Sequence, residues 1–263
     1  MQNKNPIGFF DSGVGGTSIW KEMIHLLPYE STIYLADSNN APYGQKNSQE
    51  IIELSEKNTE FLLNRNCKMI VVACNTATTN AITHLRNKYD IPFIGIEPAI
   101  KPAALQTKTK AVGILATQGT LSSELFAKTS NKFAKDIAVV EQQGTGLVEL
   151  IESNAIDSKE MEILLKRYLN PMLQQHIDHL ILGCTHYPYL IPKIKKIIGR
   201  SVKIIDSGFA VSKQIQNILQ QNNLLNREMT TPNYQFYTNK DAKVLHQLLS
   251  DVKKTLQINF LDF

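Results

Sequence analysis

Short apolar runs alternate with amphipathic segments of helical period along most of this 263-residue chain. Strands that alternate with helices in this way form parallel sheets with helices packed on both faces. The pattern therefore predicts an α/β fold with mostly parallel sheets. The runs with the length and composition of buried strands are residues 6–10, 32–36, 69–73, 92–96, 111–115, 137–140, 180–183 and 202–205.

Helix-capping residues mark two of the segments between these strands. Asn47 and Glu50 have the spacing of a capping box, in which each side chain accepts a hydrogen bond from the backbone N–H of the other residue. Asp157 and Glu160 have the same spacing. We expect Asp157 to cap a helix over residues 158–175.

The chain contains a coarse internal repeat. The segments IGFFDSGVGGTS and VGILATQGTLSS both have the pattern of a strand, a turn with glycine and a helix start, and each precedes a strand that ends at a cysteine. Asp11 and Cys74 are 63 residues apart, and Thr117 and Cys184 are 67 residues apart. The repeat predicts two pseudo-symmetric, doubly wound domains, with the active site in the cleft between them.

The repeat also suggests where the two domains begin and end. We predict that residues 1–97 and 208–263 form the first domain, which carries Cys74. Residues 98–207 then form the second domain, which carries Cys184. The C-terminal part of the first domain is interpreted as helix-rich, and we expect it to return and cover the first half of the chain.

Composition and charge narrow the possible functions. Apolar residues make up 43% of the chain and charged residues 20%, which suits a packed core and argues against disorder. The formal charge of +4 is spread along the chain, without the basic cluster that a nucleic-acid partner favours. The N-terminus does not resemble a signal peptide, and no apolar run reaches the roughly 18 residues of a membrane span. Three cysteines without paired spacing favour a reducing compartment, so we expect a cytoplasmic protein with no membrane or nucleic-acid partner.

Two of the cysteines close predicted strands, at the sheet edge where ligands bind in parallel α/β proteins. Polar residues follow both Cys74 and Cys184, and they begin helices whose free N–H groups favour a thiolate or a carboxylate. A single cysteine at such a position is more often part of the core. We keep that interpretation for Cys67. The matched pair favours a chemical role for Cys74 and Cys184.

Polar loops follow the first two predicted strands. The segment DSGVGG, residues 11–16, is interpreted as a tight turn that uses glycine for unusual backbone angles. It matches neither the P-loop pattern nor G-x-G-x-x-G, which disfavours nucleotide binding. Asp11 begins this loop as an acid at the sheet edge. The second loop, residues 37–46, contains Pro42-Tyr43-Gly44, which we expect to expose backbone amides.

Two thiols at one site suit a reaction that removes a proton from one face of a carbon and returns a proton to the other. A free cysteine with a pKa near 8.5 is a few per cent thiolate at neutral pH, so both protonation states are accessible. A papain-like pair of Cys184 and His186 is an alternative, but it leaves Cys74 without a role. The spacing of the cysteines and histidines does not suit zinc, and no nicotinamide, flavin or pyridoxal signature is present. We therefore expect no cofactor and no metal.

Five ordered segments between residue 7 and about residue 208 resemble the cofactor-independent aspartate/glutamate racemase family. They are FFDSGVGGTS, ADSNNAPYG, VVACNTATTNAI, LATQGT and LILGCTHYPYL. Aspartate racemases of this family usually contain CNTAH and GCTE, whereas this chain contains CNTAT and GCTH. The sequence is therefore similar to the glutamate branch of the family.

The resemblance implies roles for individual residues. Cys74 and Cys184 would be the two catalytic acid/bases. Asp11 would assist Cys74, and His186 would assist Cys184 together with an acid from the segment GTGLVELIES. This segment departs from the commoner form of the family, which often carries a proline.

The acid in that segment is expected to be Glu152, with Glu149 as the alternative. The resemblance further implies a set of residues that bind the two carboxylates and the ammonium group of the amino acid. They are Ser12, Pro42, Tyr43, Gly44, Asn75, Thr76, Thr117, Thr120 and Thr185.

The function implied by the resemblance is the interconversion of L-glutamate and D-glutamate, with D-glutamate supplied to bacterial peptidoglycan. The expected assembly is a homodimer. Two other classes of function stay open at this point: a cysteine-dependent hydrolase or lyase, and a non-catalytic protein that binds an acidic metabolite. The fold alone does not separate them.

Overall fold

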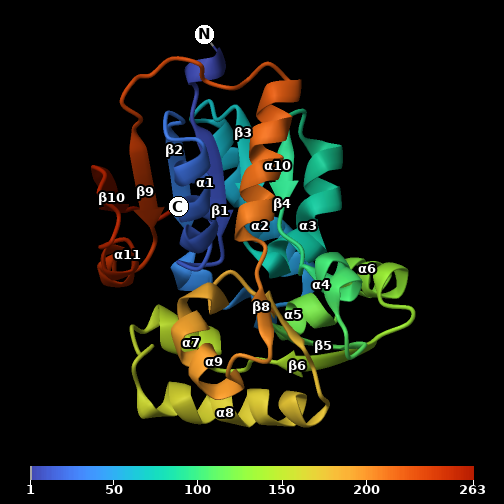
Figure 1. Ribbon diagram of the computed structural model, residues 1–263. Helices are drawn as coiled ribbons and strands as arrows, with labels where there is room; N and C mark the ends of the chain where they lie inside the picture. Colours follow the sequence, from blue (N-terminus) through green and yellow to red (C-terminus); the bar gives the residue numbers. More distant parts are fainter. Residues whose placement is uncertain (1) are drawn as a thin grey trace.

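Two parallel β-sheets form the framework of the structure, a computed structural model that describes residues 2–263 (Figure 1). The larger sheet, in the upper half of Figure 1, has the strand order β10-β9-β2-β1-β3-β4, and the smaller sheet has the order β6-β5-β7-β8. Every strand pair in both sheets is parallel. The predicted α/β fold is therefore confirmed, with sheets that are wholly parallel.

All the predicted strands are present, and two further strands follow them. The strands of the larger sheet are β1 (Ile7–Asp11), β2 (Thr32–Ala36), β3 (Met69–Val72), β4 (Phe93–Gly95), β9 (Tyr234–Thr238) and β10 (Leu256–Phe260). The strands of the smaller sheet are β5 (Ala111–Ala116), β6 (Ala138–Gln143), β7 (His179–Gly183) and β8 (Lys203–Ile205).

Helices connect the strands. The α-helices are α1 (Thr17–Leu26), α2 (Ser48–Leu63), α3 (Asn75–Lys88), α4 (Ile100–Gln106), α5 (Gln118–Leu121), α6 (Glu124–Phe133), α7 (Leu147–Glu152), α8 (Lys159–Gln174), α9 (Ile191–Ile198), α10 (Gly208–Gln221) and α11 (Lys243–Leu248). The short 3-10 helices are η1 (Gln2–Lys4), η2 (Ser38–Asn40), η3 (Tyr43–Gln45) and η4 (Tyr187–Leu190). No helix in the described part of the chain is both long and apolar enough to cross a membrane.

The internal repeat is visible in the strand order. The order β2-β1-β3-β4 of the larger sheet recurs as β6-β5-β7-β8 in the smaller one, so β1 corresponds to β5 and β3 to β7. Asp11 ends β1 and Thr117 follows β5 directly, while Cys74 lies two residues beyond the end of β3 and Cys184 follows β7 directly. The two halves therefore present chemically matched positions at the carboxyl ends of equivalent strands. The domain boundaries at residues 97/98 and 207/208 stay predictions.

The C-terminal stretch is not only a helical cover. The expectation of a helix-rich segment is wrong for β9 and β10, which extend the larger sheet beyond β2. In β9, buried and half-buried residues alternate, the period of a strand. Its Tyr234 and Phe236 rings meet the Trp20 ring edge-on, with centroids 5.2 and 4.8 Å apart. Aromatic packing against α1 therefore holds this edge of the sheet in place.

Helices cover both faces of each sheet. Apolar side chains of α1 and α10 pack on one face of the larger sheet, and those of α2 and α3 pack on the other (Figure 1). Helices α7, α8 and α9 cover one face of the smaller sheet, and α4 and α6 cover the other. One apolar cluster contains residues of both sheets, among them Tyr34 of β2 and Leu182 of β7. The two domains therefore share part of one core.

The helix caps agree with the sequence in one case and differ in the other. Asn47 and Glu50 form the predicted capping box, with Glu50 N donating to Asn47 Oδ1 at 3.0 Å. Helix α8 is capped by Ser158, whose hydroxyl accepts from the N–H of Met161, so the predicted cap at Asp157 is wrong. Asp157 instead forms an exposed ion pair with Lys193. The extended backbone of Ser158 places its short hydroxyl within reach of the first free N–H groups.

A buried ion pair holds the amino ends of β2 and β3 together. The Lys68 ammonium lies 2.6 Å from Glu30 Oε2, and the two side chains are 0% and 3% exposed. Lys68 also donates to the backbone oxygen of Asn3, and the N–H of Asn226 donates to Glu30 Oε1. The pair therefore joins the N-terminal segment and the segment between α10 and β9 to the larger sheet.

Replacing Lys68 by methionine should lower the free energy of unfolding by about 3–5 kcal/mol, because Glu30 would stay buried without its cation. Urea unfolding followed by circular dichroism measures the loss. The matched control is Lys166→Met, which removes the exposed pair with Glu162 and should cost less than about 0.5 kcal/mol. Equal losses in the two variants would show that the buried pair has no special role.

Candidate active site

A small cavity lies where the carboxyl ends of strands from both sheets meet. About 250 Å³ of space at this position, part of it open to solvent, is free of protein atoms. Both thiols that the sequence singled out line it, as does every predicted substrate-binding residue except Thr120. The lining residues are Ser12, Pro42, Tyr43, Gly44, Cys74, Asn75, Thr76, Thr117, Val148, Cys184, Thr185 and His186.

Thr120 lies just behind the cavity wall. It is fully buried, and its hydroxyl lies 3.1 Å from the Thr117 hydroxyl and 3.4 Å from that of Thr76. The three hydroxyls form one cluster, with 2.8 Å between those of Thr76 and Thr117. The structure therefore places Thr120 as a support for two lining threonines.

Cys74 begins α3 and sits at the positive end of that helix. Its sulfur accepts a hydrogen bond from the N–H of Ala77 at 3.4 Å, and its thiol lies 3.6 Å from the Ser12 hydroxyl. Burial raises the pKa of the Cys74 thiol far above its ordinary value, and the negative charge of Asp11 raises it further. In the free protein this thiol is therefore protonated at neutral pH.

Asp11 lies beside Cys74 and is fully buried. One of its carboxylate oxygens accepts from Ser12 N at 2.8 Å and the other from Gly16 N at 2.6 Å. Burial raises the pKa of Asp11 to about 6, although the positive charge of His186 and the Gly16 N–H oppose the rise. A carboxyl group with this pKa can give and accept a proton near neutral pH.

Cys184 has a different set of neighbours. Its sulfur lies 3.7 Å from His186 Nδ1, and His186 Nε2 lies 2.7 Å from Glu152 Oε1. Burial alone would lower the pKa of His186. Hydrogen bonds to Cys184 and Glu152, and the negative charges of both groups, hold that pKa well above its ordinary value. His186 is therefore a cation at neutral pH, and its ring lies against the Cys184 sulfur.

Glu152 completes this chain of contacts. The N–H of Val14 donates to its Oε1 at 2.7 Å, and the Ser38 hydroxyl donates to its Oε2 at 3.0 Å. Burial acts to raise the pKa of Glu152, but the hydrogen bond and charge of His186, with the donors from Val14 and Ser38, lower it overall. The structure thus brings Glu152, His186 and Cys184 into one relay.

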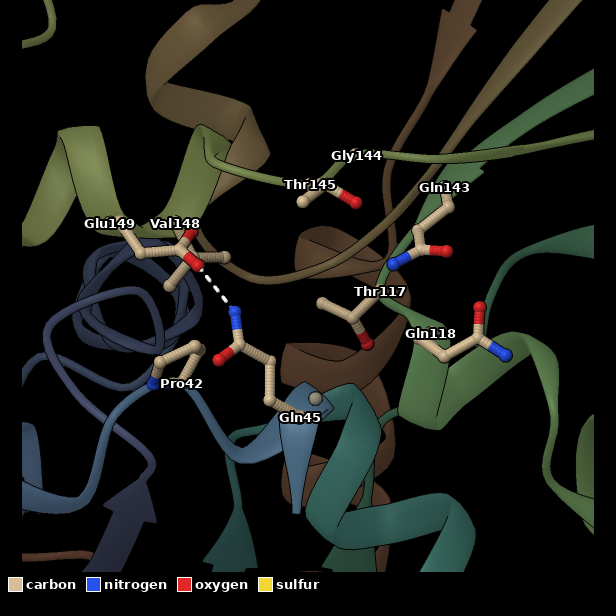
Figure 2. Close-up of a pocket in the computed structure, with 10 residues that line it drawn as sticks. Pro42, Gln45, Thr117, Gln118, Gln143, Gly144, Thr145, Val148 and Glu149 are labelled. Atoms are coloured by element: carbon tan, nitrogen blue, oxygen red, sulfur yellow. Dashed lines mark hydrogen bonds between the residues drawn. The ribbon is translucent and has the colours of Figure 1, made fainter.

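Glu149 lies at the mouth of the cavity instead. Gln45 Nε2 donates to Glu149 Oε1 at 2.7 Å, an exposed contact drawn as a dashed line in Figure 2. The contact crosses an outer pocket of about 290 Å³ that shares Pro42, Gly44, Thr117 and Val148 with the cavity. This pocket is therefore the outer part of the same site.

The glycines of the segment DSGVGG allow close approach of side chains from the other domain. A Cβ atom on Gly13 would lie 1.9 Å from Glu152 Oε1, and one on Gly15 would lie 2.3 Å from His186 Nδ1. Neither glycine has a φ angle in the left-handed region. The expectation that these glycines serve unusual backbone angles is therefore wrong, because the space beside them is what the site requires.

One lining hydroxyl has no partner. Thr185 Oγ1 is buried and makes no hydrogen bond to any residue that the structure describes. Burying such an atom without a partner is costly, and the atom lines the cavity. It therefore marks a position where a polar group of a ligand would be bound.

The sequence analysis missed Asp37 and Ser38, which follow β2. Asp37 is buried and accepts hydrogen bonds from the side chains of Tyr43, Asn40 and Asn239. A signal was present, because an Asp-Ser pair follows both of the first two strands, as Asp11-Ser12 and as Asp37-Ser38.

Among residues 2–263 no group of three or more His, Cys, Asp or Glu side chains is arranged to hold a metal ion. The absence of a metal or cofactor from the reaction stays a prediction.

Comparisons with known proteins agree on one racemase family. The family model for Asp/Glu/Hydantoin racemase matches residues 16–215. The chain is 45% identical over 236 residues to a glutamate racemase of Herpetosiphon aurantiacus, covering 90% of this chain and 93% of that protein. It is 47% identical over 225 residues to a glutamate racemase of Ectopseudomonas mendocina, covering 85% and 86%.

Solved structures agree with these relatives. The glutamate racemase isoform RacE1 from Bacillus anthracis superposes with a TM-score of 0.87 at 31% identity, covering 99% of this chain and 98% of that one. The glutamate racemase from Francisella tularensis, solved in complex with D-glutamate, has a TM-score of 0.84 at 31% identity, with the same coverage.

Replacing Asp11 by asparagine should change how stability depends on pH. Because folding raises the pKa of this group from 3.8 to about 6, the folded protein binds more protons than the unfolded chain between these values. The contribution of Asp11 to the free energy of unfolding therefore falls as pH rises through this window, by about 3 kcal/mol in total. The asparagine variant lacks this fall, which urea unfolding at pH 4, 5, 6 and 7 would measure.

The control is Asp157→Asn, which removes an exposed carboxylate whose pKa Lys193 lowers, so it should not flatten the pH profile. An Asp11→Asn protein with the same pH dependence as the parent would contradict the raised pKa.

Proposed function

Because the chain belongs to the Asp/Glu/Hydantoin racemase family, we propose that it interconverts L-glutamate and D-glutamate by proton transfer at the α-carbon. The observation that carries the proposal is the pair of thiols in one cavity. Cys74 and Cys184 end equivalent strands of two pseudo-symmetric domains, and each has its own acid/base neighbours. A reaction with a single thiol would leave one of these arrangements without a role, which disfavours the hydrolase and lyase alternatives.

The charges of the free site suit the L to D direction. Cys184, beside the His186 cation, acts as the thiolate that removes the α-proton of L-glutamate. The protonated Cys74 delivers a proton to the opposite face of the carbanion, giving D-glutamate. The step balances. On one face the C–H bond breaks as an S–H bond forms at Cys184, and on the other face the S–H bond of Cys74 breaks as a new C–H bond forms.

Asp11 supports the opposite direction. Cys74 must become a thiolate before it can remove the α-proton of D-glutamate. With its pKa of about 6, Asp11 is mostly ionised at neutral pH and can accept the thiol proton. His186 then serves as the proton source for Cys184 after the thiol has protonated the carbanion. The two assisting groups thus differ in charge but serve equivalent steps.

Neutral donors provide the substrate-binding surface. Among the described residues no lysine or arginine lines the cavity, so the substrate carboxylates would be held by hydroxyl, amide and backbone N–H groups. We assign this role to the predicted set, with Thr185 Oγ1 as a free donor already in place. Thr120 acts through Thr76 and Thr117.

The cellular role that we propose follows from the family resemblance. D-glutamate made by this reaction would enter peptidoglycan synthesis in the cytoplasm, and the active form would be a homodimer. The three cysteines are unpaired in the structure, which agrees with a reducing compartment.

Purified protein should racemise L-glutamate without added cofactor, in a reaction followed by circular dichroism. L-aspartate should react about a hundredfold more slowly, because a shorter acid leaves buried donors unpaired. Dialysis against a chelator should leave the rate unchanged. Comparable rates for the two acids would overturn the assignment to glutamate, and no racemisation of either would overturn the proposed function.

Each thiol should be required in both directions. Cys74→Ala and Cys184→Ala should each lower racemisation by at least about a thousandfold, because inversion needs a proton donor and an acceptor. Cys67→Ala is the matched control and should stay active. Cys67 is buried away from the cavity, and burial raises the pKa of its thiol to about 12.

The source of the new α-hydrogen tests the mechanism separately. In deuterium oxide, early turnover of L-glutamate should give D-glutamate labelled at the α-carbon, while the remaining L-glutamate stays largely unlabelled. Mass spectrometry after separation of the enantiomers measures both. If the remaining substrate gained label as fast as the product, the two-thiol mechanism would be wrong.

A further inference from the structure

Ser38 makes a buried contact between the two domains at a place that substrate does not reach. Its hydroxyl donates to Glu152 Oε2 at 3.0 Å, and Ser38 itself is 3% exposed. It lies in η2, which follows β2 of the larger sheet, whereas Glu152 ends α7 of the smaller domain. Ser38 does not line the cavity. Its contact therefore acts on Glu152 and not on the ligand.

The loop that carries Ser38 is itself held in place. The buried carboxylate of Asp37 accepts from the side chains of Asn40, Tyr43 and Asn239. Asn239 also accepts from the N–H of Asn39 at 2.8 Å. These bonds tie the residues on both sides of Ser38 to the segment after β9. The hydroxyl is thus presented to Glu152 from a rigid support.

Every donor to Glu152 other than His186 comes from the first domain. These donors are the Ser38 hydroxyl and the Val14 N–H, one to each carboxylate oxygen. Glu152 and His186 themselves belong to the smaller domain. If the domains moved apart, Glu152 would lose both donors and keep only His186.

We propose that Ser38 is a positioning residue for the second thiol: with the Val14 N–H, its hydroxyl holds the Glu152 carboxylate against His186, so that the relay to Cys184 is complete only while the two domains are packed together. The inference rests on the proposed two-thiol reaction and deepens it. Ser38 touches no reacting atom, so its effect reaches Cys184 through Glu152 and His186.

The charges around Glu152 explain why one hydroxyl matters. The titratable groups around it are His186, Asp11 at the end of β1 and Tyr34 of β2. Glu149 lies one turn earlier on α7, and Cys184 lies beyond His186. His186 is the only cation paired with Glu152 among the described residues. A buried carboxylate with so little compensation depends on each neutral donor, and Ser38 is one of the groups that lower its pKa.

The test compares Ser38→Ala with Ser38→Thr, which keeps a hydroxyl at the same position. Ser212→Ala is the matched control, because Ser212 is also buried but donates to Gly208 O within α10. One readout is the rate at which iodoacetamide alkylates each cysteine at pH 7, resolved by mass spectrometry. The other is the pH profile of kcat/KM for L-glutamate. Thermal unfolding checks that each variant is folded.

Ser38→Ala should slow alkylation of Cys184 by about tenfold, because a Glu152 carboxylate that is no longer held in place interacts less strongly with His186, the neighbour of the Cys184 sulfur. Alkylation of Cys74 in the same molecules should change by less than about twofold, since Ser38 does not contact it. The value of kcat/KM should fall by about tenfold and its acidic limb should move to higher pH, while KM changes little. Ser38→Thr should recover most of the parental alkylation rate, kcat/KM and pH profile. Ser212→Ala should leave all three unchanged.

Two results would overturn the proposal. One is a Ser38→Ala protein in which Cys184 is alkylated at the parental rate and the pH profile is unchanged. The other is an equal fall in the Cys184 alkylation rate and in kcat/KM for Ser38→Ala and Ser38→Thr, which would show that side-chain size and not the hydroxyl matters. If the parent protein failed to racemise glutamate, the proposed function would fail, but the alkylation rates would still decide whether Ser38 acts on Cys184.

Discussion

The negative charge of Glu152 is the constraint around which the site is built. The carboxylate is buried, and a buried charge is stable only when hydrogen bonds and an opposite charge compensate it. The compensation comes from His186 within the same domain and from two donors of the other domain. The same contacts explain the missing Cβ atoms at Gly13 and Gly15, where side chains would occupy the space of the relay. The packing of the two domains therefore determines how well the charge of Glu152 is compensated.

Pseudo-symmetry places the two thiols, but it does not make them equivalent. Both cysteines follow corresponding strands, β3 and β7, and both lie at the same cavity. Cys74 has an acid of raised pKa beside it, while Cys184 has a histidine cation. The substrate is chiral, so its α-proton faces one thiol or the other, and two thiols of identical charge would not suit either enantiomer. The two thiols therefore lie beside neighbours of opposite charge.

The sequence was sufficient for the fold and for the set of lining residues, because both depend on local signals. Apolar runs between helical segments predicted the inner strands, and the five motifs placed nearly all cavity residues. Strands β9 and β10 were missed because neither is a continuous apolar run: in YQFYT and LQINF the apolar residues are interrupted by polar ones, and β10 is largely exposed. Ser38 was missed because its partner Glu152 is 114 residues away, and only the packing of the domains brings them together. The choice of Glu152 over Glu149 depends on which helix face meets His186, a fact of tertiary structure.

In the proposed two-thiol reaction, one turnover leaves the two thiols with exchanged protonation states, and this would account for the assisting groups. After L-glutamate becomes D-glutamate, Cys184 holds the substrate proton and Cys74 has lost its own. The next L-glutamate requires the reverse arrangement, so a proton must leave the Cys184 side and another must reach Cys74. His186 and Glu152 can pass the first, and Asp11, with its pKa of about 6, can supply the second. The contact of Ser38 with Glu152 crosses between the domains next to this relay.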